Sequence, residues 1–154
     1  MDTEDQDRSP STVKQVVDRA RRLHAKPEGL LVFGDDVDAG VEGLAADAGP
    51  PKKILEHLNV LAELAQALRQ GPLGTTRVQW LKNRNVNASD ESESTSTSAS
   101  EMRQRVWHDG QYRRKFTLHT KPNDGTRTSW CVRIYFDWDP DKEVIIVAWI
   151  GRHP

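Results

Sequence analysis

Cysteine, long apolar runs and net charge are all scarce in this sequence, and each absence removes a class of function. The only cysteine, Cys131, excludes an internal disulfide and a zinc site built from thiolates. No apolar run approaches the roughly 20 residues that cross a bilayer. Residues 1–7 are acidic, unlike a signal peptide. We therefore expect a cytoplasmic protein without membrane association, whose single thiol is buried and structural.

The formal net charge of −1 predicts no general attraction to nucleic acid or to membranes. The charge is unevenly distributed, however. Residues 1–100 contain 12 basic and 16 acidic side chains, whereas residues 101–154 contain 10 and 7. A basic C-terminal part suits binding to a polyanion or pairing with the acidic part of the same chain. Ordinary solvated surface charge explains the same counts, so both interpretations stay open.

Composition divides the chain into four parts. The hydrophobic fraction of 36% is low and the charged fraction of 29% is high, so polar segments must dilute a small core. We expect a single α+β domain in which N-terminal helices pack on a small C-terminal antiparallel β-sheet. Its parts are a disordered tail at 1–10, a helical region at 11–87, a flexible serine-rich and acidic linker at 88–101, and an antiparallel β-meander at 102–154.

Apolar residues recur at helical spacing in the helical region. They predict a helix from Ser11 or Thr12 to about Ala25, a long helix at 51–70 and a short one at 77–84. The apolar stripe of the first helix consists of Val13, Val16, Val17, Ala20 and Leu23. His57 is expected to be partly buried at the edge of the long helix's apolar face. The apolar run at 30–33 fits either a short buried strand or a helix–loop anchor.

Two stretches invite a more specific interpretation. Residues 34–40 place three carboxylates close together, but without the spacing of an EF-hand, so a capped turn into a short helix at 37–46 explains them better than calcium. The helices on either side of residues 71–74 suggest a helix–turn–helix. A DNA-binding version would use Arg77, Gln79, Lys82 and Asn83. Two ordinary helices would instead pack through Val78, Trp80 and Leu81, and this is the preferred interpretation.

The C-terminal part indicates three β-strands, at 112–121, 130–137 and 143–151, with turns at 122–125 and 137–141. Turns of this length make antiparallel neighbours. The last strand is almost continuously apolar and should be buried on both faces. Asp109 and Gly110 predict a hairpin turn, preceded by a helix end or a strand at 102–107.

Side chains on a strand alternate between the two faces of a sheet. The residues expected on the core face are Phe116, Leu118, Thr120, Val132, Ile134, Phe136 and Trp138. The opposite face, predicted to be exposed, carries Thr117, His119, Lys121, Arg133, Tyr135 and Asp137. The last strand ends by bringing Arg152 and His153 close by. Ordinary cross-strand charge pairing on a solvent-exposed sheet would explain the same polar face.

This polar face contains the groups required for metal-independent RNA cleavage, which are a proton-transfer pair and cations that stabilise the charge on phosphate. The candidate catalytic residues are His119, Tyr135 and Arg133. The candidate phosphate-binding residues are Lys121, Arg113, Arg114 and Arg152, and the candidate orienting residues are Asp137 and His153. This chemistry uses no metal and no cofactor, and its partner is RNA.

Helices followed by an antiparallel sheet that bears Arg, Lys, Tyr and His resemble the RelE/ParE-type bacterial toxins. Residues 144–153 resemble the last strand of these toxins and its polar tail, and the resemblance covers residues 52–70 and 112–154. RelE-type members cut messenger RNA on the ribosome, whereas ParE-type members inhibit gyrase. The resemblance therefore implies a toxin-like endoribonuclease of bacterial origin.

The competing interpretation is a non-enzymatic protein-interaction module, or a subunit or regulator of a larger bacterial assembly. Four of the five tryptophans lie in the sheet half, at positions 107, 130, 138 and 149. Tryptophans on the surface would anchor a protein partner, through the sheet or the helical face, or would stack on bases. Tryptophans in the core would carry neither function.

Overall fold

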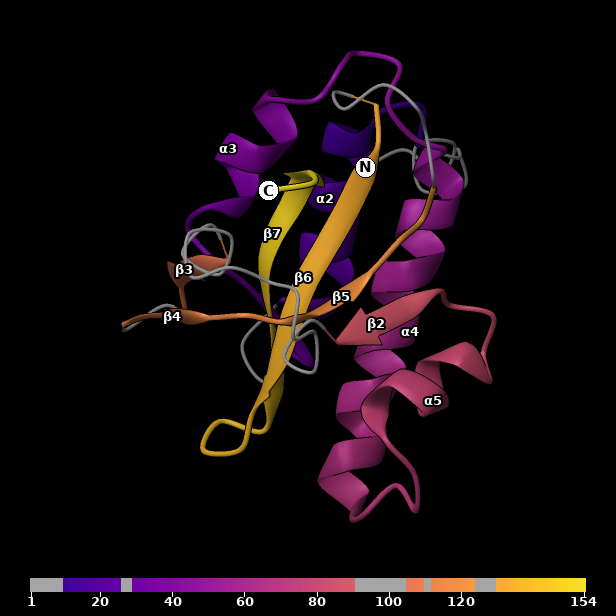
Figure 1. The fold of residues 1–154 in the computed structure, drawn as a ribbon, viewed down its shortest axis with the longest axis vertical. Coiled ribbons are helices and arrows are strands. Elements are labelled where there is room, and N and C mark those ends of the chain that lie inside the picture. Colours follow the sequence, from indigo (N-terminus) through magenta and orange to yellow (C-terminus); the bar gives the residue numbers. More distant parts are fainter. Residues whose placement is uncertain (1–9, 26–28, 91–104, 110–111, 124–129) are drawn as a thin grey trace.

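The computed structural model describes residues 10–25, 29–90, 105–109, 112–123 and 130–154 (Figure 1). The predicted tail at 1–10 and linker at 88–101 therefore lie largely outside the described residues, as do Gly110 and part of the predicted turn at 122–125. The described elements form an α+β fold in which helices pack on a five-stranded sheet, which confirms the predicted class.

Helices α2 (Val13–His24) and α4 (Pro51–Gln70) pack on each other and on the sheet. The hydroxyl of Thr12 starts α2 by accepting a hydrogen bond from the backbone N–H of Gln15 at 3.2 Å. The predicted stripe of α2 is buried except at its last member, Leu23, which is 57% exposed. Helix α4 begins and ends at the predicted residues. The short helix α5 (Arg77–Lys82) follows it and buries Trp80 and Leu81, as expected for ordinary helix packing.

The sheet has the strand order β1-β7-β6-β5-β2. Its strands are β1 (Leu31–Phe33), β2 (Ala88–Asp90), β5 (Leu118–Thr120), β6 (Val132–Asp139) and β7 (Val144–Arg152). β1 runs parallel to β7, and the other pairs are antiparallel. The apolar strand β7 is central and buried on both faces, as predicted. The strand interpretation of residues 30–33 is confirmed, and these residues extend the meander into a mixed sheet.

The predicted boundaries of the linker and of the turn at 137–141 differ from the structure. Residues 88–90, assigned to the linker, form β2 and pair with β5 in the register Ser89↔His119. Their order comes from that ladder and from the fully buried side chain of Ala88. The turn predicted at 137–141 starts later, because β6 continues to Asp139. The carboxylate of Asp139 then accepts hydrogen bonds from the N–H groups of Asp141 and Lys142, which closes the turn.

The predicted strand at 112–121 is broken into β4 (Arg113–Lys115) and β5. β4 pairs instead with β3 (Val106–His108) in a separate hairpin, at the position of the predicted hairpin turn. Because Phe116 and Thr117 belong to neither strand, the alternation of faces is interrupted there. Phe116 consequently packs in a different apolar cluster from Leu118, and the prediction that they share a face is wrong.

Helix α3 (Val37–Glu42) ends before the predicted residue 46 and lies against the second half of β7, where β1 has already ended. A Cβ atom at Gly40 would lie 2.5 Å from the carbonyl oxygen of Ile150, and one at Gly151 would lie 2.8 Å from that of Gly40. These two glycines therefore let the backbones of α3 and β7 touch.

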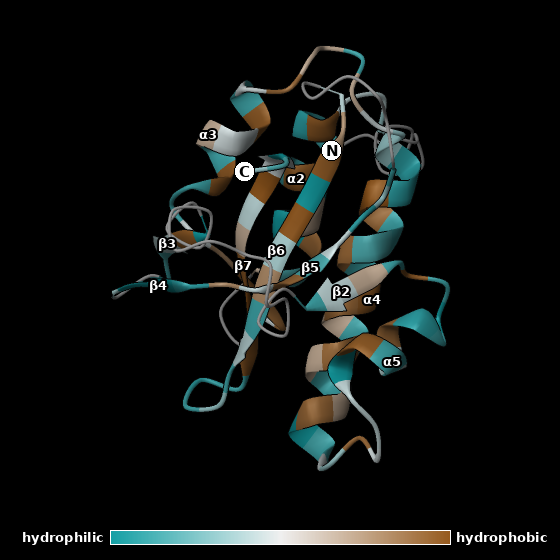
Figure 2. Ribbon diagram, viewed as in Figure 1, coloured by the Kyte–Doolittle hydropathy of each residue, from teal (hydrophilic) through white to brown (hydrophobic). Residues whose placement is uncertain are grey.

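The sheet has a core on each face. Figure 2 shows hydrophobic and hydrophilic residues alternating along β6. The larger core lies beneath α2 and α4 and includes Ile134, Phe136, Ile145, Val147 and Ile150. The second cluster, on the opposite face, contains Trp107, Phe116, Tyr135, Val144, Ile146 and Ala148. The β3–β4 hairpin supplies Trp107 to the second cluster, so both faces of the central strands are covered.

Candidate functional site

Of the predicted catalytic pair, Tyr135 belongs to the second cluster and His119 lies beside it. The two residues are register partners on β5 and β6, and their rings stack with centroids 4.7 Å apart. His119 is 3% exposed and Tyr135 is 0% exposed, so the prediction of an exposed face is wrong. Trp107, whose ring centroid lies 4.9 Å from that of Tyr135, covers Tyr135. A general base in this position has no open path to a substrate hydroxyl.

Arg133, the third predicted catalytic residue, is also buried and contacts the loop before β6. Its Nη1 donates hydrogen bonds to the carbonyl oxygens of Asn123 at 2.6 Å and Val132 at 2.9 Å. The side chain of Asn123 accepts from the N–H of Val132 at 2.8 Å. Arg133 and Asn123 together join the end of the β5 segment to the start of β6. Arg133 therefore stabilises the fold at this point and is not presented to a substrate.

Four other predicted residues do not join the catalytic pair. Lys121 lies just past β5, where its N–H donates to the carbonyl oxygen of Asn87 at 2.8 Å. Arg152 is opposite Val132, and the imidazole of the neighbouring His153 contacts its own chain at Pro154. This end of β6 is roughly 17 Å from Asp137 at the rise of a β-strand. Arg113 is exposed on β4.

Asp137 is the predicted residue around which cations converge. Its Oδ1 lies 3.6 Å from Nη1 of Arg77, and its Oδ2 lies 3.8 Å from Nη1 of Arg114. The backbone N–H of Trp138 donates to Oδ1 at 2.8 Å and orients the carboxylate. Both arginine contacts are longer than a hydrogen bond, and Asp137 is 29% exposed. We call Arg77, Arg114 and Asp137 the arginine cluster.

Arg114 is incompletely satisfied within the described part of the chain. Its Nε lies 3.5 Å from Asp109 and its guanidinium covers the ring of Phe116 at 4.6 Å. Neither Nε nor Nη2 has a hydrogen-bond partner there, although both atoms are buried. A buried donor without an acceptor costs free energy, so Arg114 is held here at a cost to stability.

Arg77 reaches Asp137 around an open edge of the sheet. β5 pairs with β6 only at Ile134 and Tyr135, so β6 has no strand neighbour on that side from Phe136 onward among the described residues. Asp137 is opposite Ile146 and faces the second cluster, whereas α5 lies on the helical side. The side chain of Arg77 therefore crosses from one face to the other where β5 is missing.

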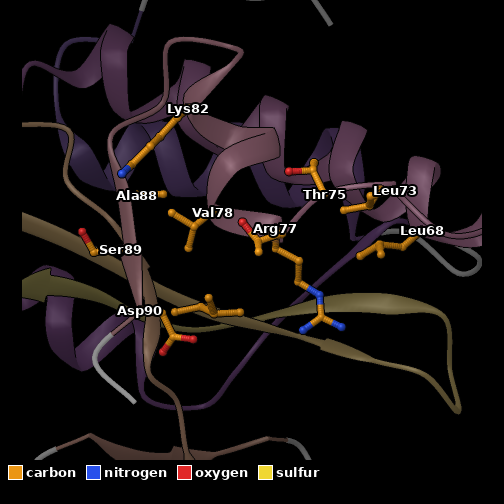
Figure 3. Close-up of a pocket in the computed structure, with 11 residues that line it drawn as sticks. Leu68, Leu73, Thr75, Arg77, Val78, Lys82, Ala88, Ser89 and Asp90 are labelled. Atoms are coloured by element: carbon orange, nitrogen blue, oxygen red, sulfur yellow. The ribbon is translucent and has the colours of Figure 1, made fainter. Parts of the chain in front are cut away.

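Arg77 also lines a pocket of about 650 Å³ between α5 and β2, which we call the α5–β2 pocket (Figure 3). Its apolar lining is Leu68, Leu73, Val78, Ala88 and Leu118, and its polar lining is Thr75, Thr76, Arg77, Lys82, Ser89 and Asp90. The sequence pattern singles out Arg77 and Lys82 for a DNA-reading helix but does not reveal the pocket. The pocket could have been located from the sequence only if residues 88–90, with the apolar Ala88, had been assigned to a strand.

His57 was predicted to be partly buried at the edge of the apolar face, but the structure buries it fully. It is 1% exposed, and its Nδ1 lies 2.9 Å from the hydroxyl of Thr120. Burial, with a smaller contribution from the positive charge of Lys53, lowers the pKa of His57 from 6.5 to about 4. The imidazole is therefore neutral at pH 7. It connects α4 to β5 and lies outside the arginine cluster.

The described ranges contain no group of three or more His, Cys, Asp or Glu side chains placed to hold a metal ion. Cys131 is a buried free thiol, as predicted. None of the helices described has the length and apolar character needed to cross a membrane.

Comparison with known proteins yields no match to any family model, curated protein or solved structure. The resemblance to RelE/ParE-type toxins accordingly stays a prediction.

Proposed function

We propose that the protein binds single-stranded RNA through the arginine cluster. The observation that supports this is the convergence of Arg77 and Arg114, from α5 and β4, on the single carboxylate of Asp137. The ion-pair contacts of Arg77 and Arg114 with Asp137 and Asp109 are 3.5–3.8 Å long, so N–H groups of both guanidiniums remain to donate to a phosphodiester. Guanidinium groups suit phosphate because they donate in a planar fork.

The resemblance to RelE/ParE-type toxins favours RNA among the nucleic acids. The exposed Arg113 and Lys115 on β4 flank Arg114 and supply further positive charge for a flexible backbone. Because the cluster lies at an open sheet edge rather than on an exposed helix face, it suits a single strand better than a duplex groove. Cleavage is not part of the proposal, since His119 and Tyr135 are buried.

The test is binding of a fluorescently labelled 12-nucleotide RNA, measured by anisotropy at several salt concentrations. The double variant Arg77→Gln/Arg114→Gln should bind at least tenfold more weakly. Its slope of log K against log salt should be smaller by about 1.4, because two single-strand phosphate contacts are lost. The control is Arg22→Gln, on the exposed side of α2, which removes a charge away from the cluster.

Equal weakening by the control and by the double variant, at matched melting temperatures, would contradict the proposal. So would the absence of any salt-sensitive RNA binding by the natural chain. A labelled DNA strand of the same sequence, measured in parallel, reports whether the 2′-hydroxyl contributes.

A second candidate, a protein-interaction module, is favoured by the open edge of β6 from Phe136 to Asp139. An unpaired strand edge can accept an extended peptide as an additional strand. This function would give partner binding that changes little with salt, in a protein that does not bind the labelled RNA.

A further inference from the structure

We infer that the α5–β2 pocket binds the nucleoside part of a nucleotide whose phosphate contacts Arg77. This inference rests on the proposed RNA-binding function and adds a second subsite to it. Arg77 belongs to both places, because it lines the pocket and lies 3.6 Å from Asp137. A ligand that places its phosphate at the arginine cluster therefore has its neighbouring base and ribose at the mouth of the pocket.

The size and lining of the pocket suit a nucleoside. Its volume of about 650 Å³ lies within the usual range for small-molecule sites. Val78 on α5 and Leu118 on β5 provide apolar walls from opposite layers, and Leu68 at the end of α4 extends them. Aliphatic walls can cover the faces of a planar base and remove apolar surface from water.

Polar groups also line the pocket and can pair with a ribose and with the edge of a base. The hydroxyls of Thr75 and Ser89 can each donate and accept, and they come from opposite sides of the pocket (Figure 3). Lys82 supplies a second cation, and its ammonium group extends toward Ala88 in the same view. A wholly apolar ligand would leave these groups unpaired, whereas a nucleoside offers partners of both kinds.

The experiment is competition against the labelled RNA by AMP, GMP, ribose 5-phosphate and inorganic phosphate. Burial of a base predicts that at least one nucleotide competes about tenfold more strongly than ribose 5-phosphate. Val78→Phe fills the pocket and should abolish this advantage without changing competition by ribose 5-phosphate. Leu73→Phe, on the loop before α5, fills the pocket from another side. It is used in place of Val78→Phe if that variant has a lowered melting temperature.

The control is Val41→Phe, made in a separate pocket of about 310 Å³ between α2 and α3. Nucleotides that compete no better than ribose 5-phosphate, or that keep their advantage in both folded pocket-filling variants, would overturn the inference. Stronger competition by the acetylated tripeptide Leu-Glu-Leu would also overturn it and assign the pocket to a protein. Each of these results leaves RNA binding at the arginine cluster intact, whereas a natural chain that binds no RNA contradicts the proposed function itself.

Discussion

Acidification should destabilise this protein through one buried residue, His57. In the folded chain, burial and the charge of Lys53 lower the pKa of His57 from 6.5 to about 4. In the unfolded chain the imidazole titrates near its ordinary pKa of 6.5. Between these values the unfolded state binds more protons than the folded state, so the free energy of unfolding falls as the pH falls. The contribution of His57 is complete above pH 6.5 and is lost progressively toward pH 4.

The size of this effect follows from the two pKa values. The difference between 6.5 and about 4 corresponds to about 3 kcal/mol over the whole range, most of which is lost by pH 4.5. The physical cause is the cost of placing an imidazolium ion at a position 1% exposed, where its described hydrogen-bond partner is the hydroxyl of Thr120.

Urea unfolding at pH 7.5, 6.5, 5.5 and 4.5 measures this loss. Carboxylates also titrate in the acidic range, so the natural chain is compared with His57→Gln, which keeps a polar side chain near Thr120 but does not titrate. Relative to His57→Gln, the free energy of unfolding of the natural chain should fall by about 2–3 kcal/mol between pH 7.5 and pH 4.5. His153→Gln, at an exposed histidine, is the matched control and should show no such change. A constant difference between His57→Gln and the natural chain at all four pH values would refute the reasoning.

Three further substitutions test the packing. Gly40→Ala should destabilise the fold by about 2 kcal/mol in chemical denaturation, because its Cβ would meet a β7 carbonyl oxygen at 2.5 Å. Gly43→Ala, whose Cβ would have no neighbour closer than 3.5 Å, is the control and should be nearly neutral. Equal effects of the two substitutions would contradict the close contact at Gly40. Tyr135→Ala should cost about 3–5 kcal/mol of unfolding free energy, since it empties the second cluster, and an unchanged melting temperature would mean that the ring is not buried. Arg133→Met should cost about 1.5–3 kcal/mol through the lost hydrogen bonds to Asn123 and Val132, and a variant of unaltered stability would argue against the structural role.

Some features of the fold follow from local pattern alone. Helix α4 has wide apolar periodicity, a proline at its start and glycine at its end, and it was predicted at its observed bounds. The continuous apolar run of β7 likewise predicts burial on both faces, because only a central strand can cover such a run. In these places the periodicity extends over enough residues to exclude other structures.

The strands of only three residues are harder to predict from the sequence. β2 reads as part of a polar linker because its Ser and Asp are typical of loops, and its order comes from pairing with β5. β1 is ambiguous for a different reason, because four apolar residues are too few to show a period. A short strand is specified by the neighbour that it pairs with, and that neighbour is far away in the chain.

The sequence by itself determined that His119, Tyr135 and Asp137 share one face of the sheet, because alternation depends only on the geometry of a strand. The tertiary structure decided what that face does. The β3–β4 hairpin brings Trp107 over Tyr135 and covers that part of the face. Because β5 begins only at Leu118, Asp137 is left open to Arg77. Coverage depends on where distant segments fold back, and no local pattern of side chains encodes that position. The candidate site therefore lies at Asp137, next to a pocket that exists only after β2 and α5 have packed together.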